Sequence, residues 1–168
     1  MLARDGEEVE EQMVDVVPSG EVEDGWLHVL DAEDQHRHPV SLVHRDHPDL
    51  QLMVVLDAVI NNADRKGGHV LVDDQGRMYG VDHGVCFHRE EKLRTVLWGW
   101  AGERLTEPCR EVLHLLETSL QGDLGDDLGE LLSRGELTMV GRRVERLLRS
   151  GLFPSPSAGW PAIPWPAF

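Results

Sequence analysis

Cysteine is scarce in this 168-residue sequence, and long hydrophobic runs are missing from it. The two cysteines, Cys86 and Cys109, stand outside any CxxC motif, which argues against a disulfide framework and favours a reducing compartment. The longest apolar run, Leu52 to Leu56, is far too short to span a bilayer. The first residues also lack the basic and then apolar pattern of a signal peptide. We therefore expect a cytoplasmic protein with no transmembrane segment.

Basic residues are outnumbered by acidic ones. The chain has 16 Lys and Arg against 31 Asp and Glu, which gives a net charge of −15. Nucleic acid and anionic membrane surfaces should repel such a chain, so we expect no nucleic-acid partner. The acid is concentrated near the start, and we interpret residues 1–24 as an acidic N-terminal segment. The remaining residues, 25–168, suit a single domain.

The hydrophobic pattern predicts an α+β domain that is mainly helical. Pro48 suits the first turn of a buried helix, Thr106 suits the N-cap of a later one, and Gly151 suits the end of the last. The turn DDQG, 73–76, separates two β-like runs and predicts a hairpin. The predicted elements are short strands at 25–30 and 39–43, a helix at 49–61, the hairpin, and helices over EPCREVLHLLETSL, DLGDDLGELLSRG and ELTMVGRRVERLLRSG.

Two segments of the C-terminal part have more than one interpretation. Proline and tryptophan exclude a regular helix over 153–168, so this tail should lie extended across the domain or project from it. Its Trp160 and Trp165 either hold the tail on its own domain or bind a partner. The arginines of 142–149 should form a solvated helix face opposite an apolar one, or contact an acidic partner.

The stretch NNADRKGGH, 61–69, is either a solvated charged turn or the catalytic loop of an enzyme. Phosphoryl transfer needs an acid to orient the attacking hydroxyl, metal ligands, and a cation near the phosphates. Asp64 and Lys66 supply the acid and the cation, and the Asp82-His83-Gly84 motif follows Asp64 by 18 residues, room for one hairpin. Gly67 and Gly68 would let the backbone approach phosphates closely.

At these residues the sequence resembles a known family. LDAVINNADRKGGHVLV followed by YGVDHGVCFH is similar to the catalytic and metal-binding loops of phosphatidylinositol 3- and 4-kinases, nearest the type II 4-kinases. The same motifs, with KLRTVLWGWAG and a WPAIPWP tail, resemble a small bacterial branch of phosphatidylinositol-kinase-like proteins. The resemblance covers roughly 14–168 and implies a protein-kinase-like C-terminal lobe for 25–168.

The resemblance also implies roles for individual residues. Asp64 matches the catalytic Asp and Arg65 the Arg of the shared pair, and Asp82 matches the metal-binding Asp. His69 stands where the wider superfamily has Asn, and imidazole suits Mg²⁺ less well than oxygen does. Lys66 or Arg65 would neutralise phosphate charge. The implied cofactors are ATP and Mg²⁺ or Mn²⁺, and the implied acceptor is an alcohol on a lipid, a protein or a small molecule.

One part of the family pattern is missing. No glycine-rich loop precedes Asp64, and the first lysine is Lys66 itself, so the sequence looks like a C-terminal lobe without its N-terminal lobe. We therefore expect an ATP-dependent phosphotransferase that is incomplete in this chain. The alternative is a non-catalytic pseudokinase or lobe fragment that acts as a binding module. A third hypothesis is a metal-dependent hydrolase that uses Asp64, His69, Asp82 and His83.

Other residues invite functional interpretations with simpler alternatives beside them. Trp98 and Trp100 bind a substrate or pack against the helices, and Cys86 is expected to be packed rather than reactive. Four histidines could suggest zinc, but their spacing fits no tight ligand pattern, and a solvated loop is the simpler interpretation: His36, His38, His44 and His47.

Overall fold

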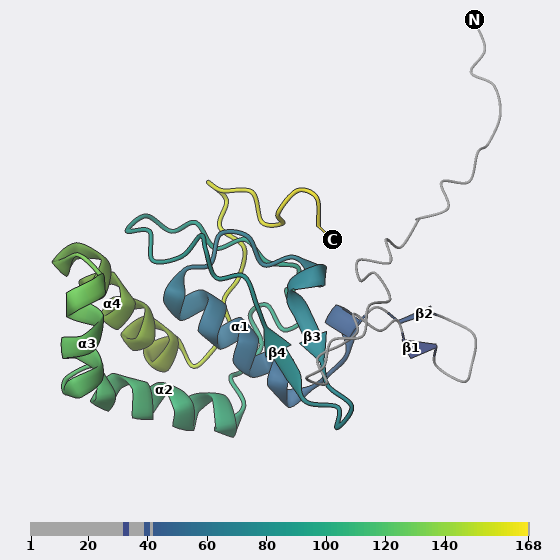
Figure 1. Ribbon diagram of the computed structural model, residues 1–168, viewed down its shortest axis with the longest axis horizontal. Coiled ribbons are helices and arrows are strands. Elements are labelled where there is room, and N and C mark those ends of the chain that lie inside the picture. The colour runs from purple at the N-terminus through teal and green to yellow at the C-terminus, as the bar shows by residue number, and fades with distance from the viewer. Residues whose placement is uncertain (1–31, 34–38, 41, 168) are drawn as a thin grey trace, which may run out of the picture.

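A computed structural model describes residues 32–33, 39–40 and 42–167. Figure 1 shows β4 crossing in front of helix α1 with β3 beside it, and α2, α3 and α4 grouped to one side. The described elements are β1 (Ala32–Glu33), β2 (Pro39–Val40), the 3-10 turns η1 (Leu42–His44) and η2 (Gly67–His69), β3 (Val70–Val72), β4 (Met78–Gly80), α1 (Pro48–Ile60), α2 (Glu107–Ser119), α3 (Asp123–Leu131) and α4 (Arg134–Ser150). The fold is α+β, as predicted. The acidic segment 1–24 and the strand expected at 25–30 lie outside the described residues.

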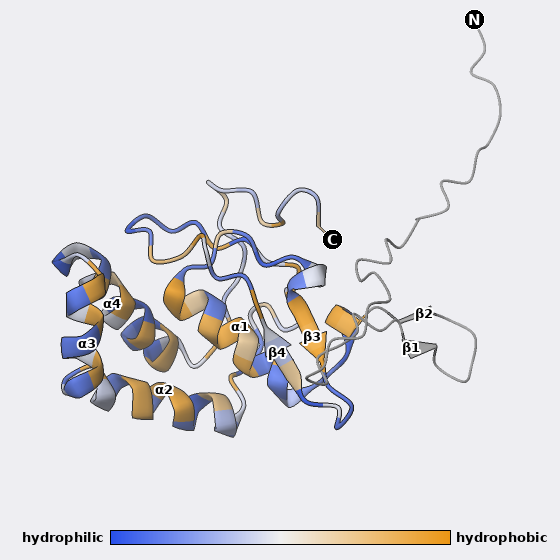
Figure 2. Cartoon of the chain, in the orientation of Figure 1, coloured by the Kyte–Doolittle hydropathy of each residue, from blue (hydrophilic) through white to orange (hydrophobic). Residues whose placement is uncertain are grey.

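Helix α1 forms the centre of the core. The Nδ1 atom of His47 accepts the Asp49 backbone N–H at 3.2 Å and caps the helix, and Pro48 occupies its first turn. Apolar residues on almost every side of the helix are buried. Figure 2 shows much of α1 in orange, which marks hydrophobic residues. The helix ends at Asn61, whose φ of 56° is left-handed. The predicted buried helix is therefore confirmed, and its end starts the charged loop.

The hairpin forms around the DDQG turn, as predicted. Strands β3 and β4 are antiparallel, with Leu71 opposite Tyr79. Asp73 fixes the turn, because its Oδ1 atom accepts the backbone N–H groups of Gln75 and Arg77 at 2.9 Å each. The Asp49 carboxylate accepts the Met78 N–H at 3.0 Å and ties the hairpin to the start of α1.

Helix α4 begins two residues before the segment predicted from the sequence, because Ser133 and Glu136 form a capping box. Gly151 ends it with a φ of 64°. Thr106 occupies the predicted N-cap of α2, but its hydroxyl donates to Gln51 Oε1 at 3.1 Å instead of capping the helix.

The expectation that the arginines of 142–149 form a solvated face is wrong at Arg143. That side chain is completely buried, whereas Arg142, Arg146 and Arg149 are exposed. The helical period explains the difference, since position 143 lies three residues after buried Val140 and falls on the same face.

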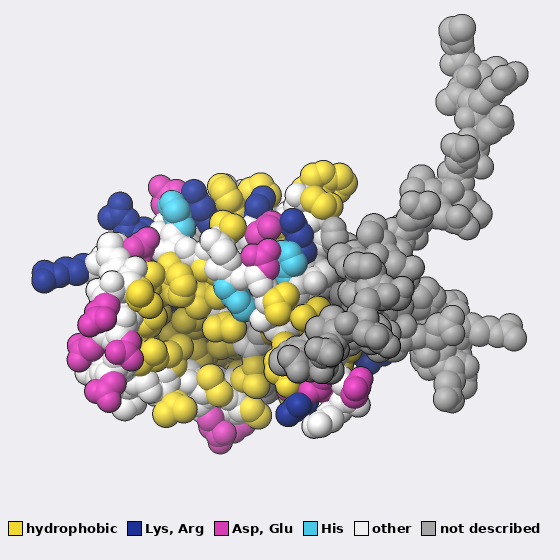
Figure 3. Space-filling view, viewed as in Figure 1, with side chains coloured by type: hydrophobic (Ala, Val, Ile, Leu, Met, Phe, Trp, Pro, Cys, Tyr) yellow, Lys and Arg dark blue, Asp and Glu magenta, His cyan; other side chains and the backbone are white. Residues whose placement is uncertain are grey.

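The C-terminal tail lies extended across the domain. Phe153 belongs to the core, and its ring packs tilted against Trp100 at 6.2 Å between centroids. Figure 3 shows apolar side chains gathered over the helical side of the molecule. Leu56 and Val112 are among the exposed large apolar residues of the described chain. Within the part of the chain that the structure describes, no helix is long and apolar enough to cross a membrane.

Candidate functional site

The loop NNADRKGGH begins where α1 ends, and its two asparagines anchor it. The Asn61 amide donates to the carbonyl oxygens of His88 and Glu90 at 2.9 and 2.7 Å, so the loop is tied to the segment after the hairpin. The Asn62 amide donates to Asp57 Oδ1 at 3.0 Å, and its own oxygen accepts the Asp64 N–H at 3.0 Å. Both asparagines are fully buried, so these bonds fix the position of the backbone at Asp64.

Arg65 joins the loop to the Asp82 segment. Its Nε and Nη2 atoms donate to the two oxygens of Asp57 at 2.9 Å each, and both side chains are 0 % exposed. Its Nη1 atom donates to the carbonyl oxygens of His69 and Val81 at 3.2 and 2.7 Å. Nη2 also lies 2.7 Å from His83 Nε2, which must accept because guanidinium only donates. One buried cation thus holds α1, the loop and the residues on either side of Asp82.

Backbone bonds and a glycine complete this connection. The Ala63 N–H donates to the Val85 carbonyl at 2.9 Å, and the Val81 N–H donates to the His69 carbonyl at 2.9 Å. A Cβ at Gly80 would meet Nη2 of Arg65 at 3.0 Å. Gly80 therefore leaves the space through which the guanidinium passes.

Asp64 is partly exposed between two cations. Its carboxylate oxygens lie 3.3 Å from Lys66 Nζ and 3.7 Å from Arg94 Nη2, and its side chain is 26 % exposed. Arg94 is itself fixed, because its Nε donates to the Ala63 carbonyl at 2.7 Å. Arg94 was not among the site residues predicted from the sequence, since it stands 30 residues after Asp64 and outside both the Asp64 loop and the Asp82-His83-Gly84 motif.

His69 and Asp82 are brought together, as a shared role would require. His69 Nε2 lies 3.5 Å from Asp82 Oδ2, and Asp82 is 61 % exposed. Asp82 has a left-handed φ of 55°, a conformation that Asp tolerates better than most residues. His69 Nδ1 is buried with no hydrogen-bond partner, so no bond there fixes the tautomer. Among the described residues, no group of three or more His, Cys, Asp or Glu side chains could hold a metal ion.

The two glycines of the loop have different surroundings. The Gly67 N–H donates to the Ala167 carbonyl of the tail at 2.8 Å. A Cβ at Gly68 would meet nothing within 4 Å, so the space over this residue is open. The backbone is therefore accessible at Gly68, whereas the tail already uses the N–H of Gly67.

The tail forms one wall of the site. The Trp160 ring lies 5.0 Å from Lys92 Nζ and 5.7 Å from Arg94 Cζ, which are cation–π distances. The Ala162 carbonyl accepts the Thr95 N–H at 3.1 Å and the Trp98 indole N–H at 2.9 Å. Trp160 thus packs on its own domain, whereas Trp165 is 90 % exposed.

The other described residues for which the sequence offered a functional role are packed or take part in structural hydrogen bonds. Burial, followed by the charge of Asp57, raises the pKa of the Cys86 thiol to about 11, as expected for a packed cysteine. Trp100 donates its indole N–H to Asp46 at 3.2 Å. His47 caps α1, while His36 and His38 lie outside the described residues.

Comparison with known proteins finds a mycobacterial relative. The chain is 44% identical over 156 residues to Protein Rv2133c of Mycobacterium tuberculosis. The match covers 93% of this chain but 56% of that protein, so the chain spans little more than half of its relative's length. No protein-family model and no solved structure matches the chain. The name of the relative states no activity, so the chemistry has to be argued from the residues.

Proposed function

We propose that this chain is a catalytic lobe of a phosphatidylinositol-kinase-like phosphotransferase, which moves a phosphoryl group from ATP to an alcohol. The observation that carries the proposal is the buried Arg65 guanidinium, which binds the carbonyl groups of His69 and Val81 and so joins the Asp64 loop to Asp82. Phosphoryl transfer depends on positioning more than on covalent chemistry. A shared buried cation supplies fixed positions for both acids.

In this proposal Asp64 orients the acceptor hydroxyl and accepts its proton. Lys66 lies beside that carboxylate and neutralises charge on the transferred phosphoryl group. Arg94 is a second cation of the same kind. Arg65 is completely buried, so its role is to position the two acids rather than to touch phosphate.

Asp82 and His69 fit a magnesium or manganese ion that the phosphates of the nucleotide would also bind. Asp82 offers an exposed carboxylate, and His69 offers an imidazole nitrogen 3.5 Å from it. Magnesium commonly takes one or two protein ligands and completes its shell with water and substrate phosphates. When bound, the ion would neutralise phosphate charge. The imidazole favours manganese more than a second oxygen ligand would.

A non-catalytic binding module is the second candidate, and one contact favours it. The Ala167 carbonyl occupies the Gly67 N–H, which is one of the two backbone groups expected to approach phosphates. The hydrolase hypothesis has less support. Its fourth residue, His83, turns Nε2 toward Arg65, and within the described ranges the four residues form no metal cluster.

Calorimetric titration of ATP with Mg²⁺ or Mn²⁺ tests the proposal. We expect metal-dependent binding by the chain and loss of binding in Asp82→Ala. Asp74→Ala is the matched control, because Asp74 is an exposed acid in the nearby hairpin turn and should change nothing. No ATP binding with either metal would favour the binding module. Failure of the longer mycobacterial relative to phosphorylate lipid, protein or small alcohols would exclude the enzyme.

A further inference from the structure

A cavity of about 520 Å³ lies between the segment 88–90 and one face of α4. Its size falls within the range of small-molecule sites. The lining residues are His88, Arg89, Glu90, Gly135, Thr138, Met139 and Arg142. None of them belongs to the candidate site around Asp64 and Asp82.

The two arginines of the lining are available to a ligand. Arg89 and Arg142 are exposed, and neither forms an ion pair in the described part of the chain. Arg142 makes a weak polar contact, to the sulfur of Met139 at 3.9 Å. Gly135 is what admits Arg89, because a Cβ there would meet the Cδ of Arg89 at 2.9 Å.

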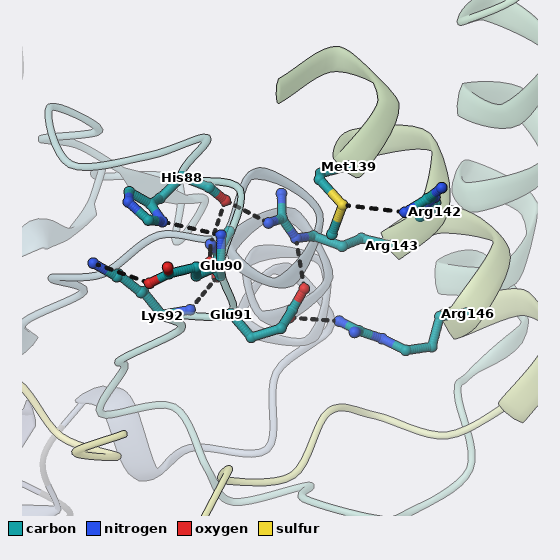
Figure 4. Close-up of polar contacts among 9 residues, drawn as sticks. His88, Glu90, Glu91, Lys92, Met139, Arg142, Arg143 and Arg146 are labelled. Carbon is teal, nitrogen blue, oxygen red and sulfur yellow. Dashed lines mark hydrogen bonds and ion pairs between the residues drawn. The ribbon is translucent and has the colours of Figure 1, made fainter. Parts of the chain in front are cut away.

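A third arginine, next to the cavity, has one nitrogen with no hydrogen-bond acceptor. Arg143 is completely buried, donates from Nε to Glu91 at 3.2 Å and from Nη2 to the His88 carbonyl, and leaves Nη1 with no partner. In Figure 4 this nitrogen points between His88 and Met139, both of which line the cavity. A buried, unpaired N–H on a cation is unfavourable and normally indicates a missing acceptor.

His88 adds a neutral donor. Its Nδ1 atom accepts the Glu90 backbone N–H at 3.0 Å, so the proton of the neutral ring is on Nε2. The acids nearby all have partners. Glu136 accepts hydrogen bonds from Ser133, and these bonds, followed by the charges of Arg89 and His88, lower its pKa. Glu90 pairs with Lys92 at 3.8 Å, and Glu91 lies 2.8 Å from Arg146 as well as beside Arg143.

We propose that this cavity binds a small phosphomonoester, with Arg89 and Arg142 binding the phosphate and Arg143, buried behind the lining with its Nη1 unpaired, adding positive charge. Arginine guanidinium groups suit phosphate because they donate two parallel hydrogen bonds. The Met139 side chain is an apolar wall for the organic group. The site does not depend on the proposed function, although His88 connects the two regions, because its carbonyl accepts from both Asn61 and Arg143.

Calorimetry at low salt with inorganic phosphate and with phenyl phosphate tests this site. Losing one charge-assisted contact should weaken binding about tenfold or more, so Arg142→Ala and Arg89→Ala should each do so. Arg149→Ala removes an exposed arginine of the same helix outside the cavity lining and should leave affinity unchanged.

A second pair of variants tests the geometry without removing a charge. Gly135→Ala should displace Arg89 and weaken binding, whereas Gly141→Ala, whose Cβ would meet nothing within 4 Å, should not. Thermal unfolding of each variant separates lost binding from lost folding. Asp82→Ala should retain phosphate binding, which separates this site from the ATP site. The proposal is overturned if the unaltered chain binds neither phosphate compound. It is also overturned if Arg89→Ala and Arg142→Ala bind phosphate as tightly as the unaltered chain does.

Discussion

Replacing Arg65 by Met should destabilise the fold more than an ordinary surface change. The substitution removes two hydrogen bonds of 2.9 Å to Asp57 and leaves that carboxylate 0 % exposed with Asn62 as its remaining side-chain donor. It also takes the donor from the carbonyl groups of His69 and Val81. Stranding one partner of a buried ion pair costs about 3 to 5 kcal/mol. A domain has a total stability of about 5 to 15 kcal/mol, so the loss is a large part of it.

Urea unfolding followed by circular dichroism measures this loss. We expect Arg65→Met and Asp57→Leu each to lower the free energy of unfolding strongly. The double variant should lose clearly less than the sum, because no buried charge is then stranded. Arg77→Met is the matched control, since Arg77 pairs with Asp73 at 2.7 Å but its side chain is 61 % exposed. Its cost should be small, because solvent screens an exposed ion pair.

Two results would refute this reasoning. A loss of less than about 1 kcal/mol in Arg65→Met would mean that the buried pair does not hold the two loops together. Simple additivity of Arg65→Met and Asp57→Leu would mean that the two side chains are not energetically coupled.

Three further predictions concern charge, thiol chemistry and the tail. Burial tends to raise the pKa of Glu91, but hydrogen bonds and charges from Arg146 and Arg143 outweigh it, and the pKa is lowered. This carboxylate therefore stabilises the fold above its unfolded pKa and loses that effect as the pH falls through its folded pKa, so Glu91→Gln should flatten the acid limb of a stability-against-pH curve. Burial and the pKa of about 11 should make Cys86 react slowly with a disulfide reagent near neutral pH, and fast labelling of the native protein would contradict this. Trp160→Leu should lower the thermal midpoint by a few degrees through loss of the two cation contacts, with exposed Trp165→Leu as an unaffected control.

The sequence alone located most of the architecture. Apolar residues on nearly every side of α1 indicated burial, the DDQG turn indicated the hairpin, and prolines excluded a helical tail. These features are local, because hydrophobic period, turn chemistry and missing N–H groups act over a few residues. The same local order placed Asp64 and Asp82 at the two ends of a hairpin. It could not assign them a reaction, which stays a proposal.

The tertiary structure decided which charges are buried and which face solvent. Arg65 and Lys66 are adjacent in the sequence, yet Arg65 is completely enclosed and Lys66 is 24 % exposed. Likewise Arg143 is completely buried, whereas its neighbour Arg142 is exposed. Long-range partners set these outcomes, because a guanidinium is buried only where Asp57 or Glu91 and backbone carbonyls meet it. Such meetings depend on packing between distant segments, which no short pattern in the chain encodes.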